Sequence, residues 1–211
     1  MTHAPETLRM KYQHVRIRPQ TGASLIVVML ILVVVSILGV SGIQIAMMGE
    51  RGTRNDRDQQ VAWQAAEAAL MDAEFDIEGL PTTSTTKRNT IFKSGATDIA
   101  KFETNCGSSG QSRGLCALNP TDKAAWLTVD FTTTGNAAST VQFGTFTGRI
   151  FPSGTKGIQP SKPPRYVIEL IPDPSEDRVK PTARRFVYRV TAMGFGPNPE
   201  SQAVVQMIYR N

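Results

Sequence analysis

Histidine is nearly absent from this sequence of 211 residues, and its two copies, His3 and His14, both lie before Gly22. Ser-His-Asp catalysis, Cys-His catalysis and His-ligated metals are therefore excluded for residues 23–211. No Gly-rich phosphate loop and no H-E-x-x-H pattern is present, and the carboxylates form no recognisable motif. The sequence predicts no enzyme, no metal or cofactor site and no small-molecule substrate.

Cysteine is equally scarce, with only Cys106 and Cys116 in the chain. Two thiols cannot make a four-thiolate zinc site. The spacer between them, "GSSGQSRGL", is rich in glycine and serine and can bend back, which favours one disulfide closing a short loop. Two buried free thiols are the alternative reading. A redox-active pair is disfavoured because the Cys-x-x-Cys spacing is missing.

Excess positive charge is small outside the N-terminus. The formal charge of the chain is +5, and residues 1–22 contribute +3 of it, which leaves +2 for all the rest. Aromatic and basic residues are not interleaved in the way that nucleic-acid-binding proteins show. The sequence therefore gives no direct sign of a nucleic-acid partner.

The chain does have one long apolar run, from Ala23 to Gly49, and its first charge afterwards is Glu50. These 27 residues exceed the apolar core of a secretory signal, about 7–15 residues, and suffice for a membrane-spanning helix, which needs about 20. Four basic residues precede the run, Arg9, Lys11, Arg16 and Arg18. Because positive residues stay on the cytoplasmic side, we expect a single-pass anchor with its N-terminus inside and residues after about 50 outside.

Residues 50–78 continue as a predicted amphipathic helix, rich in Ala, Glu, Gln and Arg. Its apolar stripe repeats every four residues through Val61, Ala65, Ala69, Ala73 and Ile77. Gly79 is a plausible stop and Pro81 cannot continue the helix. Five acids crowd the end of this helix, where its dipole prefers cations. We expect arginines of the later sheet to offset them.

The C-terminal third reads as strands. Apolar and polar residues alternate in "RYVIELI", "RRFVYRVTAM" and "QAVVQMIYR", which is typical of half-buried strands, and "GFGPNPES" reads as the hairpin loop between the last two. Residues 125–131 and 140–151 also look like strands. The predicted fold is α+β, with a long N-terminal helix packed on an antiparallel β-sheet.

A basic leader that ends in glycine and meets an apolar run at once resembles a type IV prepilin. The resemblance implies a cut after Gly22 by the prepilin peptidase and methylation of the new N-terminus at Ala23. It also implies an inner-membrane protein with a periplasmic C-terminal domain that later joins the pilus at the cell surface. Its domains would be a leader (1–22), a transmembrane and assembly helix (23–49), an amphipathic helix (50–78) and a pilin head (79–211).

The N-terminal part resembles the PilX-type minor pilins more specifically. The residues that carry this likeness are Glu50, Arg51, Asn55, Arg57, Asp58, Ala62 and the "QAAEAAL" of residues 64–70. "PPRYVIEL", "YRVTAMGFG" and "AVVQMIYR" resemble the family's C-terminal part. In one respect the chain departs from pilins in general, because Val27 stands where the fifth residue after the cut is usually glutamate.

The resemblance implies a structural, non-enzymatic minor pilin that helps to start a type IV pilus, at or near its tip. Its partners would be other minor and major pilins, contacted through the N-terminal helix. Two alternatives remain open. One is an adhesin or binding module that uses loops 81–125. The other is a minor pseudopilin of type II secretion, for which the acids of "DPSEDRVK" (173–180) are the nearest approach to a calcium loop.

Overall fold

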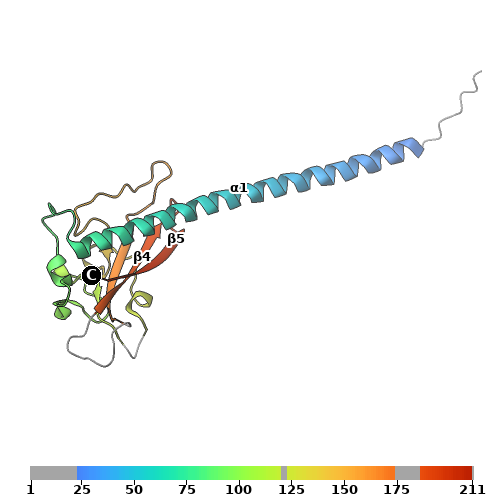
Figure 1. Cartoon of the computed structure of the whole chain (residues 1–211). Helices are drawn as coiled ribbons and strands as arrows, with labels where there is room; N and C mark the ends of the chain where they lie inside the picture. Colours follow the sequence, from blue (N-terminus) through green and yellow to red (C-terminus); the bar gives the residue numbers. More distant parts are fainter. Residues whose placement is uncertain (1–22, 120–122, 174–185, 211) are drawn as a thin grey trace, which may run out of the picture. The chain divides into compact units, whose positions relative to one another are not determined.

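The computed structural model of the chain describes residues 23–119, 123–173 and 186–210. Its described residues divide into two compact units, one ending at Glu50 and the other beginning at Arg51. Helix α1, Ala23–Glu78, contributes residues to both. The second unit, called the head unit below, contains the end of α1 and every described strand (Figure 1). The leader 1–22, with Gly22, lies outside the described residues, and so does 174–180 of the acidic stretch.

Strands β3 (Arg165–Pro172), β4 (Phe186–Phe195) and β5 (Gln202–Tyr209) form the centre of the sheet and pair in antiparallel fashion. The hairpin between β4 and β5 is confirmed, with a loop shortened to residues 196–201. Two short strands, β1 (Leu115–Cys116) and β2 (Val141–Gln142), both pair with β3. The fold is α+β, as predicted, but the sheet is mixed, because β1 runs parallel to β3.

The predicted strands at 125–131 and 140–151 are wrong. Residues 125–127 form a turn of 3-10 helix, and the second segment contributes only β2. Gly144 ends β2 because its φ of +81° leaves the extended region, and a side chain there would collide with the carbonyl of Arg149. Other short 3-10 helices cover Asn89–Phe92, Ile99–Lys101, Gly110–Ser112 and Gly135–Ala137.

The amphipathic half of α1 is confirmed, and it covers one face of the sheet (Figure 1). Its buried stripe consists mainly of alanines, Ala62, Ala65, Ala66, Ala69 and Ala73, and ends with Ile77. Small side chains let the helix backbone approach the sheet closely. A side chain at Gly194 of β4 would collide with the carbonyl oxygen of Ala62 and the amide nitrogen of Ala66. Helix and sheet are thus in backbone contact at this glycine.

Helix α1 ends as expected at Gly79, whose φ is +83°. The amide of Leu80 donates to the carbonyl of Phe75 at 2.8 Å, the bond that closes a Schellman motif. After this end the chain turns within the head unit into the connector 82–88. Ser84 and Thr86 of that connector donate to the carbonyls of Phe146 and Thr145 at 2.7 and 2.9 Å.

The opposite face of the sheet is covered by loops, so the prediction of half-buried strands fails for β3. Residues 165–170 are buried on both faces. The face turned toward α1 carries Tyr166, Ile168 and Leu170. On the other face, Val167 packs in a second cluster with the two cysteines, Ala125 and Phe131. Of the three central strands as the structure describes them, β5 keeps the alternation of buried and exposed side chains that a half-covered strand shows.

Candidate functional site

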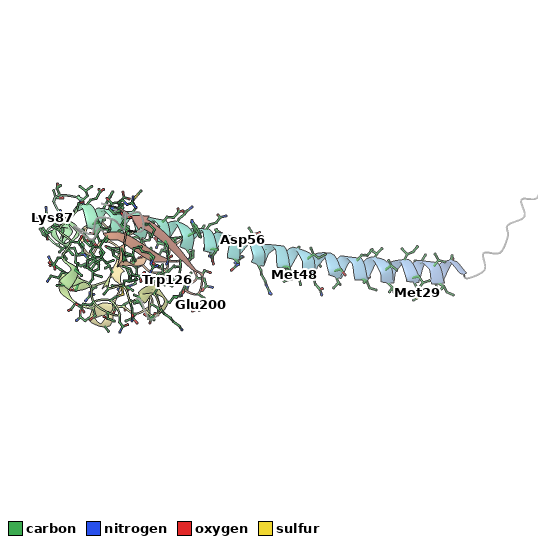
Figure 2. The ribbon with its side chains drawn as sticks, turned by 60° about the horizontal axis from the view of Figure 1, so that its bottom comes forward. Met29, Met48, Asp56, Lys87, Trp126 and Glu200 are labelled. Carbon is green, nitrogen blue, oxygen red and sulfur yellow. A yellow bond between two sulfur atoms is a disulfide. The ribbon has the colours of Figure 1, made fainter. Side chains whose placement is uncertain are left out.

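The first candidate site is the apolar segment of α1, residues 24–49. Every large aliphatic side chain from Leu25 to Met48 is between 53% and 72% exposed. Figure 2 shows Met29 and Met48 extending from the ribbon. In the described part of the chain this is the helix long and apolar enough to cross a membrane by length and composition. A helix that is apolar on all sides requires apolar surroundings, which the described residues do not supply.

Two serines of this segment have their hydroxyl groups satisfied within the helix. Ser36 and Ser41 donate to the carbonyls of Leu32 and Ile37, four residues earlier, at 2.6 and 2.8 Å. Serine hydroxyls that bond to their own helix leave no free donor on the surface. Apart from Ser24 and Gln44, the segment therefore presents an apolar surface to whatever surrounds it.

Three predicted site residues lie at the start of α1. Gly22 is outside the described residues, and Ala23 is the first residue of the helix. Val27 follows one turn later, with 53% of its surface exposed. The segment 24–49 carries no carboxylate that could replace one at this position. An ammonium group placed beside Val27 in a low-dielectric setting would find no counter-charge in the segment 24–49.

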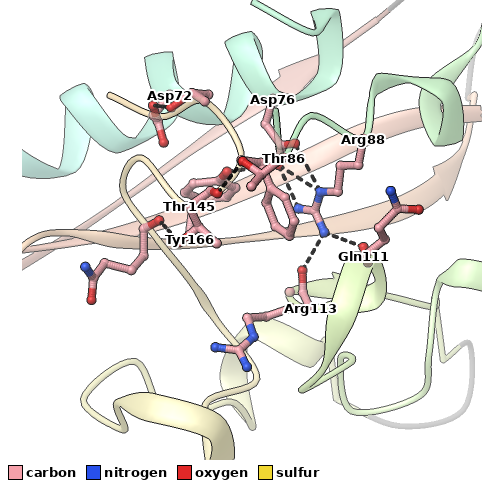
Figure 3. A network of polar contacts seen from close by, with 12 residues as sticks. Asp72, Asp76, Thr86, Arg88, Gln111, Arg113, Thr145 and Tyr166 are labelled. Atoms are coloured by element: carbon pink, nitrogen blue, oxygen red, sulfur yellow. Dashed lines mark hydrogen bonds and ion pairs between the residues drawn. The ribbon is translucent and has the colours of Figure 1, made fainter. Parts of the chain in front are cut away.

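The second candidate site is a polar network at the end of α1 in the head unit, drawn in Figure 3. Asp76 and Arg88 form an ion pair, and the side chains of both are fully buried. Arg88 donates to both carboxylate oxygens of Asp76 at 2.7–3.1 Å. Tyr166 of β3 donates its hydroxyl to the same carboxylate at 2.9 Å, and burial together with this charge raises the pKa of Tyr166 well above its usual value. The network thus links helix, connector and sheet.

Arg88 also holds the loop between the cysteines. Its Nη1 donates to the carbonyls of Gln111 and Arg113 at 2.6 and 2.7 Å (Figure 3). The guanidinium lies 3.7 Å from the ring centre of Phe146, a cation–π contact. One side chain therefore satisfies the carboxylate of α1 and two backbone carbonyls of the cysteine loop.

A second acid, Asp72, is held one turn earlier. It accepts from the amide of Gly144 at 2.7 Å and from the hydroxyl of Thr147 at 2.6 Å. Arg149 lies 3.5 Å away. Burial nevertheless raises the pKa of Asp72, because loss of solvent outweighs these contacts.

Two of the five acids at the end of the helix, Asp72 and Asp76, are therefore offset by arginines, but not by those expected. The arginines that meet Asp72 and Asp76 come from loops and not from the sheet. The sheet arginine Arg189 instead pairs with Glu169 of β3, at 2.8 Å. A signal for the network existed in the sequence, since Asp72 and Asp76 stand four residues apart, directly before Ala73 and Ile77 of the predicted buried stripe. Nothing local identified Arg88 as their partner.

Cys106 and Cys116 are joined, so the predicted disulfide is confirmed, and both residues are buried. Cys116 belongs to β1, which pairs with β3, so the bridge fastens the preceding loop to the sheet. The sequence pattern did not predict that the neighbouring polar residues of β3 are buried. Arg165 donates to Thr140 at 2.6 and 2.9 Å, and Glu169 accepts from the amide of Ala125 at 2.9 Å.

A shallow hollow of about 180 Å³ lies beside the disulfide loop, lined by Asn105, Thr128, Val129, Asp130, Thr133, Ala137 and Ser139. Both carboxylate oxygens of Asp130 already accept hydrogen bonds, from Thr132 and Thr133. These bonds lower the pKa of Asp130 to about 2. Within the described residues, no group of three or more His, Cys, Asp and Glu side chains gathers as a metal site would require.

Comparison with known protein families gives two matches. Residues 51–211 match the family described as type IV pilus assembly protein PilX C-term, and residues 21–70 match the family described as PilX N-terminal. The first match alone covers more than half of the chain. Neither the comparison with curated proteins nor that with solved structures finds a match.

Proposed function

The chain belongs to the PilX family of type IV pilus assembly proteins, and on this premise we propose that it is a minor pilin that helps to start pilus assembly. In this proposal it lies at or near the tip. The observation that carries it is the apolar segment 24–49, which is exposed on all sides and lacks a carboxylate at Val27. Such a subunit is a structural component of the pilus, and we assign it no catalytic role.

The proposal includes processing at the start of α1. The prepilin peptidase would remove residues 1–22 by cutting after Gly22 and would methylate Ala23. The cut would separate the basic leader from the apolar segment and leave an amine at the beginning of the helix. Mass spectrometry of membrane-extracted protein tests this step, with an expected chain that begins at Ala23 and carries one added methyl group. A chain that keeps the leader would contradict it.

Before assembly, the protein would lie in the inner membrane as a single-pass protein with a cytoplasmic N-terminus. The basic residues before the apolar run support this orientation. The Cys106–Cys116 disulfide supports a periplasmic head, because disulfides persist in oxidising compartments. The apolar segment would then exchange lipid for the apolar helices of other minor and major pilins as the fibre forms.

The tip position follows from the charge that Val27 does not provide. In pilins the glutamate at this place is thought to meet the N-terminal ammonium of a neighbouring subunit. A buried ammonium without a counter-charge costs several kcal/mol, about 3–5 by analogy with broken buried ion pairs. The first subunit of a fibre has no subunit above it, so it has no ammonium to neutralise. A chain with valine here fits that position and is disfavoured in the shaft.

Deleting the protein and labelling it in the fibre test this proposal. Deletion should lower the number of pili far more than the length of those that remain, and label should lie at fibre ends. Val27→Glu should move label from the ends to the sides. Val28→Glu is the matched control, since it adds the same charge one residue further on, on a different side of the helix. Even labelling along the shaft by the unmodified protein would refute the tip position.

A further inference from the structure

Strand β5 ends the sheet on one side, because the described strands follow the order β1, β3, β4, β5. The amide of Gly196 donates to the carbonyl of Ser201 at 2.7 Å, so every second pair from this point exchanges hydrogen bonds with β4. The residues of β5 between these pairs turn their backbone groups away from β4. They are Gln202, Val204, Gln206 and Ile208.

Three of these residues, Val204, Gln206 and Ile208, have no backbone partner among the described residues, and we call them the β5 edge. Gln202 differs, because its carbonyl accepts from the side chain of Gln59 in α1 at 3.3 Å. Val204 is 43% exposed and Ile208 is 59% exposed. Proteins protect open edges with charged residues or proline, and β5 contains neither. The β5 edge is therefore open to another strand.

One side of α1 borders β5 along its whole length. Gln59 bonds to the first residue of β5, and Glu78 accepts from the hydroxyl of Tyr209, the last residue, at 2.7 Å. Burial and the charges of Glu78 and Glu74 raise the pKa of Tyr209, so both acids lie near this end of β5. Intervals of three or four residues place further side chains on the same side of the helix. These are Trp63, Glu67, Leu70 and Glu74.

We call Trp63, Glu67, Leu70, Glu74 and Glu78 the acidic flank. Glu67 and Glu78 are exposed and Glu74 is half-buried. Glu67 accepts from the indole nitrogen of Trp63 at 2.7 Å, and Trp63 is 50% exposed. Among the described residues, no cation forms an ion pair with any of these three acids. A tryptophan ring beside carboxylates suits lysine or arginine, which can stack on the ring and pair with the acid.

From the open edge and the acids beside it we infer that the β5 edge binds an extended segment of another protein, which adds a strand to the sheet. Backbone groups free at every second residue are matched by an extended peptide. Side chains of the added strand alternate between the two faces of the sheet. One set lies beside Val204 and Ile208 and is apolar. The other set points toward the acidic flank and contains lysine or arginine.

A second copy of β5 does not meet this requirement. Its side chains on the face toward α1 include Val205, Met207 and Tyr209, which carry no cation for the acidic flank. The partner is therefore a different polypeptide. The inference concerns the head unit alone and does not depend on a position in the fibre.

Amide hydrogen exchange of the full chain in detergent tests the inference with a defined probe, a capped peptide of four Val-Lys repeats. At millimolar peptide, the amides of Val204, Gln206 and Ile208 should exchange about tenfold more slowly or less, because each gains an acceptor. A capped peptide of four Val-Glu repeats has the opposite charge and should change them by less than about twofold. Equal results with both peptides would overturn the inference. Slow exchange without any peptide would also overturn it, because the edge would then be covered already.

The edge itself is tested by Val204→Lys with Ile208→Lys, which places two charges on it. The slowing of the Gln206 amide by the Val-Lys peptide should be lost. Leu127→Lys with Ile150→Lys is the matched control, because it makes the same change at two exposed apolar residues of the head unit. In this control the slowing should stay within about twofold. A slowing that survives the edge variant would refute strand addition at β5.

The acidic flank is tested by Glu67→Lys with Glu74→Lys. The Val-Lys peptide should then lose its effect and the Val-Glu peptide should gain it, because the charge beside the edge is reversed. Glu103→Lys with Glu200→Lys makes the same change in net charge at two exposed acids elsewhere and should leave the preference unchanged. An unchanged preference in the flank variant would refute the basic character of the partner. These measurements need neither membrane nor pilus, so the proposed function can stand when they fail.

Discussion

One face of the sheet is covered by a single helix, and the other is covered by loops. On the helix side, α1 contributes a row of alanines in backbone contact with Gly194. On the loop side, residues 103–119 and 123–131 are held by a disulfide and by hydrogen bonds to a few buried polar groups, notably Glu169, which accepts from the amide of Ala125. Arg88 connects the two systems, because it bonds both to α1 and to the cysteine loop.

The difference lies in how the stabilising free energy is distributed. Burial on the helix side is shared by many small contacts, so no single side chain carries much of it. The loop side depends on individual bonds whose loss leaves buried polar groups unpaired. We therefore expect single substitutions to open the loop side locally, while the helix side resists all changes except those that push the backbones apart.

The largest effect is expected from Arg88→Met. The change leaves the buried carboxylate of Asp76 without its cation and two loop carbonyls without their donor. Breaking a buried ion pair in this way costs about 3–5 kcal/mol. Urea unfolding of the full chain in detergent measures the change in unfolding free energy.

Two controls separate the ion pair from general damage at this site. Arg113→Met removes an arginine of the cysteine loop, which donates to the carbonyl of Gly135 at 3.1 Å, and should cost about 1 kcal/mol or less. Arg88→Met combined with Asp76→Leu should recover part of the loss, because no buried charge then remains unpaired. If the double variant loses as much unfolding free energy as Arg88→Met and Asp76→Leu lose in sum, this account of the ion pair is refuted.

The next effect is expected from removing the disulfide, with Cys106→Ser and Cys116→Ser together. The cost should be about 2–4 kcal/mol, through greater freedom of the unfolded chain. Hydrogen exchange gives the sharper measurement. Amides of β1 and of residues 123–131 should lose protection, whereas those of β4 and β5 should keep it. If the amides of β4 and β5 lose as much protection as those of the loop side, the helix cover and the loop cover of the sheet do not unfold independently.

A smaller effect is expected on the helix side from Gly194→Ala. The added methyl group would collide with the backbone of α1 at Ala62 and Ala66, and helix and sheet would have to separate. Overpacking of this kind costs about 1–3 kcal/mol. Gly52→Ala is the matched control, since no atom lies within 4 Å of the new methyl and the helix should gain up to about 1 kcal/mol. A harmless Gly194→Ala would contradict the close contact.

The smallest effect concerns acid on the loop side. Hydrogen bonds from Thr133 and Thr132 lower the pKa of Asp130 from 3.8 to about 2. A lowered pKa in the folded state stabilises above the unfolded value, and this contribution is lost as the pH falls from about 4 to about 2. Asp130→Asn should therefore flatten the decline of unfolding free energy in that range. Thr133→Val, which removes one donor, should flatten it partly, and an unchanged slope in both variants would contradict the assignment.

Local patterns predicted much of the helix side. The alanine stripe, the stop at Gly79, strands β3 to β5 and their hairpin follow from periodicity and from turn residues close in sequence. The loop side could not be predicted in this way. The burial of Arg165 and Glu169 depends on loops far away in the sequence, so alternation made them look solvent-exposed. Arg88 carries no local sign of its role, whereas the disulfide was readable because the chain has only two cysteines.

The disulfide also has a mechanical consequence for a protein that is pulled along its length. The ten residue steps from Cys106 to Cys116 would span about 34 Å when fully extended, but the bridge holds the two Cα atoms 4.1 Å apart. When tension unfolds the head unit, its contour length is therefore about 30 Å shorter than that of the same residues without the bridge. The cysteine loop, which Arg88 fastens to α1, is therefore also a part of the chain that cannot lengthen under load.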